Sequence, residues 1–99
     1  METYAIRRKS AWNSADHFRD MVARSKQVAD DEFTADLRWI RSNVVAEGDG
    51  TLGSICIFQA VAPDAIHRHA RRVGIPADEV HNLSDLIVLR PDPARGGLR

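Results

Sequence analysis

The feature that most constrains this chain is the order in which strand-like and helix-like hydrophobic periods follow one another. Across Thr3–Lys9 the larger apolar side chains recur at every second residue, which predicts a strand with one buried face. From Ser14 to about Asp31 apolar side chains recur at helical spacing, and Asn13 or Ser14 can serve as the N-cap. The first third of the chain is therefore a strand followed by a helix.

The remaining elements follow in a different order. Leu37–Val45 and Ser54–Phe58 predict a hairpin around the glycine-rich sequence AEGDGTLG. Pro63–Val73 predicts a second helix, with proline in its first turn and Gly74 as its left-handed C-cap. The apolar segment Leu86–Leu89 predicts a fourth strand.

Strand, helix, hairpin, helix and strand in this order are typical of the split βαβ arrangement. We therefore predict an α+β fold of the ferredoxin-like βαββαβ type, with an antiparallel four-stranded sheet that carries both helices on one face. Residues 1–90 are predicted to form a single domain, and residues 91–99 a flexible C-terminal tail.

Two of the predicted strands are apolar on both sides. A strand with one wet face alternates apolar and polar residues, but Ile55–Phe58 and Leu86–Leu89 do not. A second copy of the sheet can cover the face that the helices leave bare, so we expect a homodimer formed through the open sheet face. The alternative is a monomer whose strands are shielded only by loops or by the C-terminal tail.

Composition narrows the functional classes. Lys plus Arg equals Asp plus Glu at 14 each, so the basic excess typical of nucleic-acid binding is missing. No apolar run approaches the roughly 20 residues of a membrane-spanning helix. The N-terminal METYAIRRKS has no apolar signal core, and the single cysteine, Cys56, has no internal disulfide partner. We expect a soluble cytoplasmic protein without nucleic-acid or membrane partners.

Four stretches carry a resemblance to a known family: LRWIRS, ICIFQA, APDAIHRHA and GIPADEV, which begin at Leu37, Ile55, Ala62 and Gly74. Over roughly residues 3–90 the chain resembles a family of small bacterial domains first named as domains of unknown function and partly described as nickel-binding. The resemblance implies a dimeric ferredoxin-like fold and nickel or another divalent transition metal as the bound ion. It also implies His69 as a metal ligand, since the family commonly has histidine there.

The sequence around His69 leaves its role open. His67 and His69 form an HxH pair, but residues two apart on a helix point about 200° away from each other and cannot share one ion. His69 lies near the buried stripe of its helix, so it is either a metal ligand or a core histidine bonded to the backbone. Cys56 is similarly either a soft ligand or nucleophile, or a small buried hydrophobe.

A second group of residues suggests a small-ligand pocket. Trp39 and Arg41 are expected to project from the same side of the second strand, and Tyr4 adds an aromatic ring on the first. Aromatic walls with one cation suit a small anionic or planar ligand, which we expect to contact Tyr4, Trp39, Arg41 and His69. Trp39 can equally be the largest core or interface residue.

These observations lead to a non-catalytic binding protein: a small homodimer that holds a nickel-like ion or a small ligand. The alternative is a cofactor-independent isomerase or oxygenase of the dimeric α+β barrel type, with His69 as general base. No phosphate loop, CxxC, HExxH or GxSxG motif is present, so nothing in the sequence positively supports an enzyme.

Overall fold

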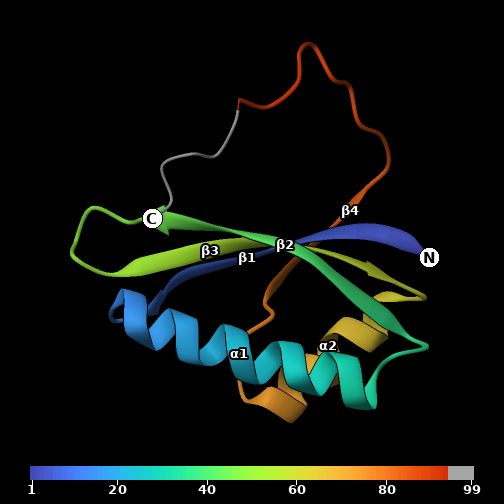
Figure 1. The fold of residues 1–99 in the computed structure, drawn as a ribbon, viewed down its shortest axis with the longest axis horizontal. Coiled ribbons are helices and arrows are strands. Elements are labelled where there is room, and N and C mark those ends of the chain that lie inside the picture. Colours follow the sequence, from blue (N-terminus) through green and yellow to red (C-terminus); the bar gives the residue numbers. More distant parts are fainter. Residues whose placement is uncertain (94–99) are drawn as a thin grey trace.

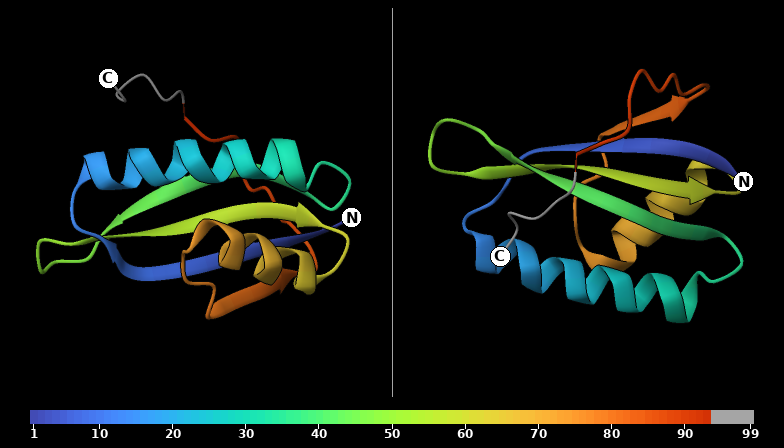
Figure 2. Two further views of the ribbon diagram at one scale, coloured as in Figure 1. Left: turned by 90° about the horizontal axis from the view of Figure 1, so that it is seen from below. Right: turned by 45° about the horizontal axis from the view of Figure 1, so that its top comes forward.

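The computed structural model describes residues 1–93 and confirms the ferredoxin-like α+β fold. The sheet order is β2-β3-β1-β4, and every neighbouring pair is antiparallel. Both helices cover one face of the sheet, and no helix or strand within residues 1–93 packs on the other face (Figures 1 and 2). The elements are β1 (Glu2–Trp12), α1 (Ala15–Glu32), β2 (Leu37–Ala46), β3 (Leu52–Ala60), α2 (Pro63–Val73) and β4 (Glu79–Leu83).

The two helices begin differently. Ser14 is the N-cap of α1, and its Oγ accepts a hydrogen bond from the His17 backbone N–H at 3.1 Å. Helix α2 starts after Ala62, which has no side chain able to cap, and ends at Gly74 in the left-handed conformation with φ +86°. Among residues 1–93, no helix is long and apolar enough to cross a membrane.

The core lies between the helices and the inner face of the sheet. Strand residues from β1 and β3, chiefly Ile6 and Phe58, meet Val28 of α1 and Ile66 of α2. Because one face of each strand supplies these side chains, burial alternates along β1 from Tyr4 to Arg8. The alternating apolar residues predicted for the first strand are thus the ones that face the helices.

The predicted position of the fourth strand is wrong. β4 is Glu79–Leu83, and Leu86–Leu89 lies beyond it in no regular structure. β4 pairs with β1, and Leu83 is already opposite Thr3, next to the first residue of β1. β1 therefore ends before the apolar segment can pair with it. Val80 of β4 packs against the core on the helix side of the sheet, opposite Ile6 of β1.

The face opposite the helices carries the apolar side chains predicted for the run Ile55–Phe58, but not those of Leu86–Leu89, which lie outside the sheet. Ile55 and Ile57 of β3 point away from the helices, because their neighbours Cys56 and Phe58 point into the core. Ile55 is 37% exposed. We call this surface the open face; it consists of Arg38, Arg41 and Asn43 of β2, Ile55, Ile57 and Gln59 of β3, Thr3, Ala5 and Arg7 of β1, and Glu79, His81 and Leu83 of β4.

Candidate functional site

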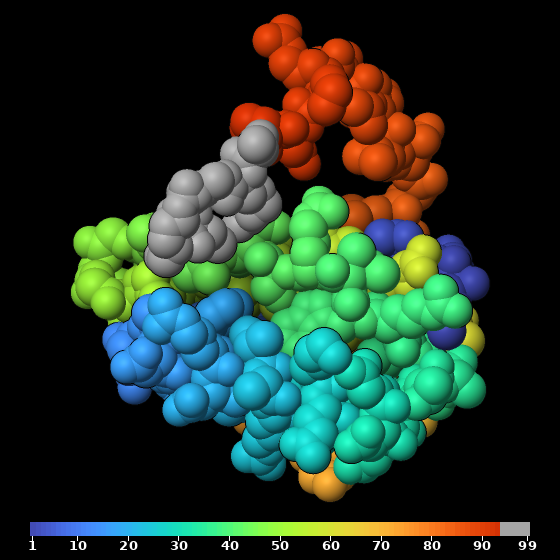
Figure 3. Space-filling model, in the orientation of Figure 1, coloured from blue at the N-terminus to red at the C-terminus, as the bar shows by residue number. Residues whose placement is uncertain are grey.

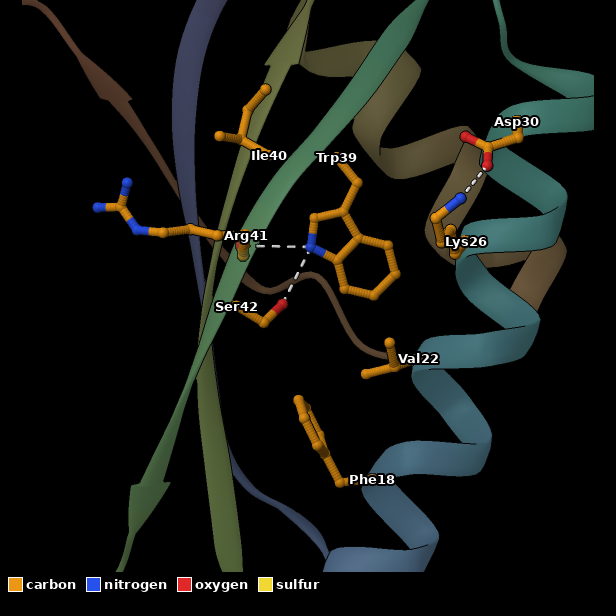
Figure 4. A pocket seen from close by; sticks show the side chains of 8 residues that line it. All are labelled: Phe18, Val22, Lys26, Asp30, Trp39, Ile40, Arg41 and Ser42. Carbon is orange, nitrogen blue, oxygen red and sulfur yellow. Dashed lines mark hydrogen bonds and ion pairs between the residues drawn. The ribbon is translucent and has the colours of Figure 1, made fainter. Parts of the chain in front are cut away.

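A groove runs between α1 and the edge strand β2. Its central section has a volume of about 340 Å³, with Trp39, Phe18 and Val22 forming an apolar wall. Figure 4 shows the indole of Trp39 turned from β2 toward α1, with Val22 and Phe18 facing it from the helix. The groove continues in both directions, towards Ala15 at the start of α1 and towards Thr34 beyond its end.

Trp39 is held in one orientation. Its ring stacks on Phe58 with centroids 5.2 Å apart and planes 14° apart. Its indole Nε1 donates to Ser42 Oγ at 2.9 Å and more weakly to the Arg41 carbonyl at 3.3 Å. The indole thus lies between core and groove, where it serves both as a packing residue and as a wall of the groove.

The expectation that Trp39 and Arg41 share one side of β2 is wrong. Trp39 is opposite Phe58 and Arg41 is opposite the next residue, Ile57, so Ile40 is the extra residue of a bulge. Because of this extra residue, the side chains of Trp39 and Arg41 lie on opposite faces of the sheet, although the two residues are two positions apart. Trp39 points toward the helices, while the Arg41 side chain points to the open face, away from α1 (Figure 4).

The charged groups at the rim of the groove come from α1 instead. Lys26 forms an ion pair with Asp30 one turn later, and both line the groove beside Trp39. The hydrogen bond to Asp30 raises the pKa of Lys26 above its usual value. Lys26 therefore stays charged near neutral pH, and Asp30 balances its charge at the rim of the central section.

A chain of hydrogen bonds leads from the groove into the core. Ser42 Oγ, which accepts from Trp39, donates to Cys56 Sγ at 3.0 Å, and Cys56 lies 3.8 Å from Ser54 Oγ. Ser54 also accepts from the indole of Trp12 at 3.3 Å. Cys56 is thus buried and hydrogen-bonded on both sides. Sequence patterns could not predict this chain of hydrogen bonds, because its members come from three strands.

Arg8 is a buried cation beside Cys56. It is 3% exposed, and its Nε donates to the carbonyl of Pro76. Burial lowers the pKa of Arg8, and the neighbouring Cys56 partly opposes that shift. Its positive charge near Cys56 disfavours a second cation there, which makes the core side of β3 a poor place for a metal ion.

His69 is buried in the core and does not line the groove. It is 1% exposed, and its Nε2 lies 2.9 Å from the Ser25 carbonyl, so Nε2 carries the proton and donates. Its ring packs edge-on against Phe33 and tilted against Phe58, with centroids 5.6 and 5.8 Å apart. Burial lowers the pKa of His69, more than the Ser25 bond raises it. A general base in the groove would have to be another residue.

Tyr4 is likewise a core residue. It is 2% exposed, opposite Phe58 on the helix side of β1, and it is not among the residues that line the central groove. Burial raises the pKa of its phenol, with a smaller contribution from Glu2. Of the four residues expected to meet in one pocket, the structure therefore puts only Trp39 with its side chain in the groove.

Within residues 1–93, no three His, Cys, Asp or Glu side chains come close enough to hold a metal ion. One pair of possible ligands lies on the open face, where His81 Nε2 is 3.7 Å from Glu79 Oε1. Both side chains belong to β4 and are well exposed, at 62% and 41%. Imidazole and carboxylate are ligands of divalent transition metals. The alternating Glu-Val-His of residues 79–81 could have indicated this pair, had the strand been placed there.

Comparison with known proteins agrees with the fold. Residues 4–83 match a family described as "Nickel responsive protein SCO4226-like". The crystal structure of SCO4226 from Streptomyces coelicolor A3(2) superimposes with a TM-score of 0.69 at 16% sequence identity, and the match covers 86% of this chain and 99% of that chain. A search of curated proteins finds no match.

Proposed function

Because the chain belongs to the SCO4226-like family of nickel-responsive proteins, we propose that it binds nickel or another divalent transition-metal ion as a homodimer. The family match over residues 4–83 is the observation that carries the proposal. These residues include both helices and the whole sheet except Glu2 and Thr3 of β1, so the match concerns the entire folded domain.

The open face supports the dimer. Ile55 and Ile57 form an apolar centre on it, and Leu83, which is 41% exposed, lies on the same face of the sheet, two strands away on β4. A two-fold axis through this face would bury the same apolar residues from both copies, as in an isologous interface. Burial of that surface offsets the modest core of a domain of this size.

The ion would be held between the copies by His81 and Glu79. One copy supplies two donors, and a second copy related by a two-fold axis supplies two more of the same kinds. His81 is opposite Ala5 and Glu79 is opposite Arg7, so both lie on the face that dimerisation would cover. Lys9 Nζ lies 3.4 Å from Glu79 Oε2, and this ion pair would have to break for Glu79 to bind an ion.

His69 is the ligand that the sequence resemblance favours, and its Nδ1 is the ring atom that Ser25 leaves free. To bind an ion there, the core around Phe33 and Phe58 would have to open. The exposed pair on β4 needs no such rearrangement, and for this reason we prefer it.

Calorimetric titration of nickel chloride into the untagged, chelator-free full chain tests the proposal, together with its mass in solution. We expect binding by a dimer, and a loss of affinity of at least about tenfold in His81→Ala and in Glu79→Gln. His67→Gln, on the partly exposed part of α2, is the matched control. Loss of binding in His69→Gln alone would place the ion in the core instead. A wild-type protein that binds no divalent ion would refute the function.

A further inference from the structure

An ion pair with little exposure crosses one end of the sheet. Glu47 belongs to the turn between β2 and β3, which projects at that end (Figures 1 and 3), and it reaches over β3 to Arg7 of β1. Arg7 Nη2 donates to both carboxylate oxygens, at 2.9 and 3.1 Å. The two side chains are only 20% and 13% exposed. Charge-assisted hydrogen bonds of this kind are among the stronger ones in proteins.

The surroundings of this pair fix it in place. The backbone N–H of Ser10 donates to Glu47 Oε2 at 2.7 Å, and Arg7 Nη1 donates to the Arg8 carbonyl at 2.9 Å. Gly53 of β3 lies against the pair, and a Cβ added there would collide with the Glu47 carboxylate and the Arg7 guanidinium. The bond from Arg7, and then the bond from Ser10, lower the pKa of Glu47. The carboxylate is therefore charged at neutral pH.

The position of Arg7 in the sheet would allow it a different partner. Arg7 is directly opposite Glu79 in the pairing of β1 with β4. Residues opposite each other on one face have Cβ atoms about 4.5–5.5 Å apart, well within the reach of an arginine. Within residues 1–93, however, the ion-pair neighbours of Glu79 are Lys9 and His81, and Arg7 pairs with Glu47. Glu47 thus decides where the Arg7 guanidinium lies.

The direction of Arg7 matters for a metal ion at Glu79. Lys9 and His81 are already beside this carboxylate, so a third basic group there would leave it still less available to an ion. A unit positive charge about 6 Å from a divalent ion weakens binding by about tenfold even at the dielectric constant of water. An Arg7 that turned to Glu79 would occupy the carboxylate and repel the ion as well.

We propose that Glu47 keeps Glu79 available to the metal ion by holding Arg7 away from it. The inference rests on the metal site of the proposed function and adds Glu47 to it as a positioning residue, which does not itself touch the ion. Gly53 belongs to the same arrangement, because only a residue without a side chain leaves room for the pair.

The pair also lies beside an irregular part of β1, which gives a second reading to be tested. Ser10 has a positive φ of 49°, and the pairing of β1 with β3 shifts between Arg8 and Trp12. If Glu47 served only to hold this bulge, its loss would disturb the strand whatever the charge of residue 7.

Calorimetric titration of nickel chloride into the full chain separates the two readings. The variants are Glu47→Gln and the double variant Arg7→Gln/Glu47→Gln. The matched control is Glu32→Gln, because Glu32 accepts two hydrogen bonds from Arg72, both at 2.9 Å, in an ion pair that joins the two helices. It frees an arginine in the same way, on the side of the sheet away from Glu79.

We expect Glu47→Gln to weaken nickel binding by at least about fivefold, because the freed Arg7 competes for Glu79. The double variant should return to within about twofold of the wild type, since it has no cation to release. Glu32→Gln should bind as the wild type does. Arg7→Gln alone should bind at least as tightly as the wild type, and it keeps the test decisive if Glu47→Gln does not fold.

Salt gives a readout that a purely structural role would not change. Between about 0.02 and 0.5 M sodium chloride the Debye length falls from about 20 Å to about 4 Å. The deficit of Glu47→Gln relative to wild type should therefore shrink as salt is added. A deficit that is independent of salt and persists in the double variant would overturn the proposal in favour of the bulge.

The remaining outcomes separate this inference from the function on which it rests. A wild type that binds nickel, with Glu47→Gln binding equally well, would refute the role of Glu47 alone. Weaker binding by Arg7→Gln would refute it too. A wild type that binds no divalent ion would refute the proposed function, and the positioning role with it.

Discussion

At the scale of single residues, the type of a residue predicts its role less well than the residues around it do. Two histidines two positions apart on α2 have different fates, because His67 is partly exposed while His69 is 1% exposed and bonded to Ser25. His81, an ordinary surface histidine by sequence, lies beside Glu79 on the open face. Spacing along the chain could not distinguish these cases, since the neighbours of each histidine come from other elements.

The lowered pKa of His69 predicts a pH-dependent stability. As pH falls below about 6.5, the unfolded chain takes up a proton at His69 that the folded protein, with its lowered pKa, does not, so unfolding becomes easier. His69→Gln removes this titration. At pH 8 we expect the variant to be less stable than wild type by about 1 kcal/mol in urea unfolding, from lost packing on the two Phe rings.

The difference in unfolding free energy between wild type and His69→Gln should shrink as the pH is lowered from 7.5 to 5.5, because only the wild type loses stability through this residue. Val73→Ala, which removes no titratable group from the same helix, should keep a constant difference over that range. A His69 difference independent of pH would show that the ring is solvated or already charged in the folded protein.

At the scale of elements, the helices were better predicted than the strands. α2 spans Pro63–Val73 as predicted, because proline, helical apolar spacing and a C-terminal glycine all act locally. β4 was misplaced because its position depends on where β1 ends, and the bulge at Ile40 was missed because only pairing with β3 reveals it. Strand pairing depends on two segments of the chain, so the sequence of either segment alone does not predict it.

The missing cap of α2 gives a prediction for this element. Ala62 has the extended backbone of an N-cap, with φ −164° and ψ 158°, but no side-chain acceptor. Ala62→Ser should stabilise the protein by about 1 kcal/mol, and thus raise its midpoint of thermal unfolding by roughly 4–8 °C. Ser14→Ala, which removes the existing cap of α1, should lower it by a similar amount. An unchanged midpoint for Ala62→Ser would mean that α2 does not fray at its start.

At the scale of the whole molecule, the proposed dimer makes stability depend on concentration. If two copies unfold together, the midpoint of thermal unfolding rises with protein concentration. Ile57→Lys places a charge at the centre of the open face and should abolish this dependence while leaving the folded monomer intact, since Ile57 is outside the core. Scanning calorimetry at two protein concentrations about 50-fold apart measures the midpoint and its dependence on concentration.

A wild-type midpoint that is the same at both concentrations would contradict the dimer. The control for Ile57→Lys is Val61→Lys, which adds the same charge at a comparably exposed position outside the open face. It should keep the concentration dependence of the wild type.

The sequence by itself determined the order of the elements, both helices and their ends, the ferredoxin-like fold and the apolar side chains that Ile55 and Ile57 place on the open face. These follow from local periods and caps, which need no distant partner. Tertiary structure decided where β4 lies, which face Arg41 points to, that His69 and Tyr4 are core residues, and that Leu86–Leu89 is exposed and outside the sheet. Each of those depends on the register between strands remote in sequence, and register is fixed only when the sheet assembles.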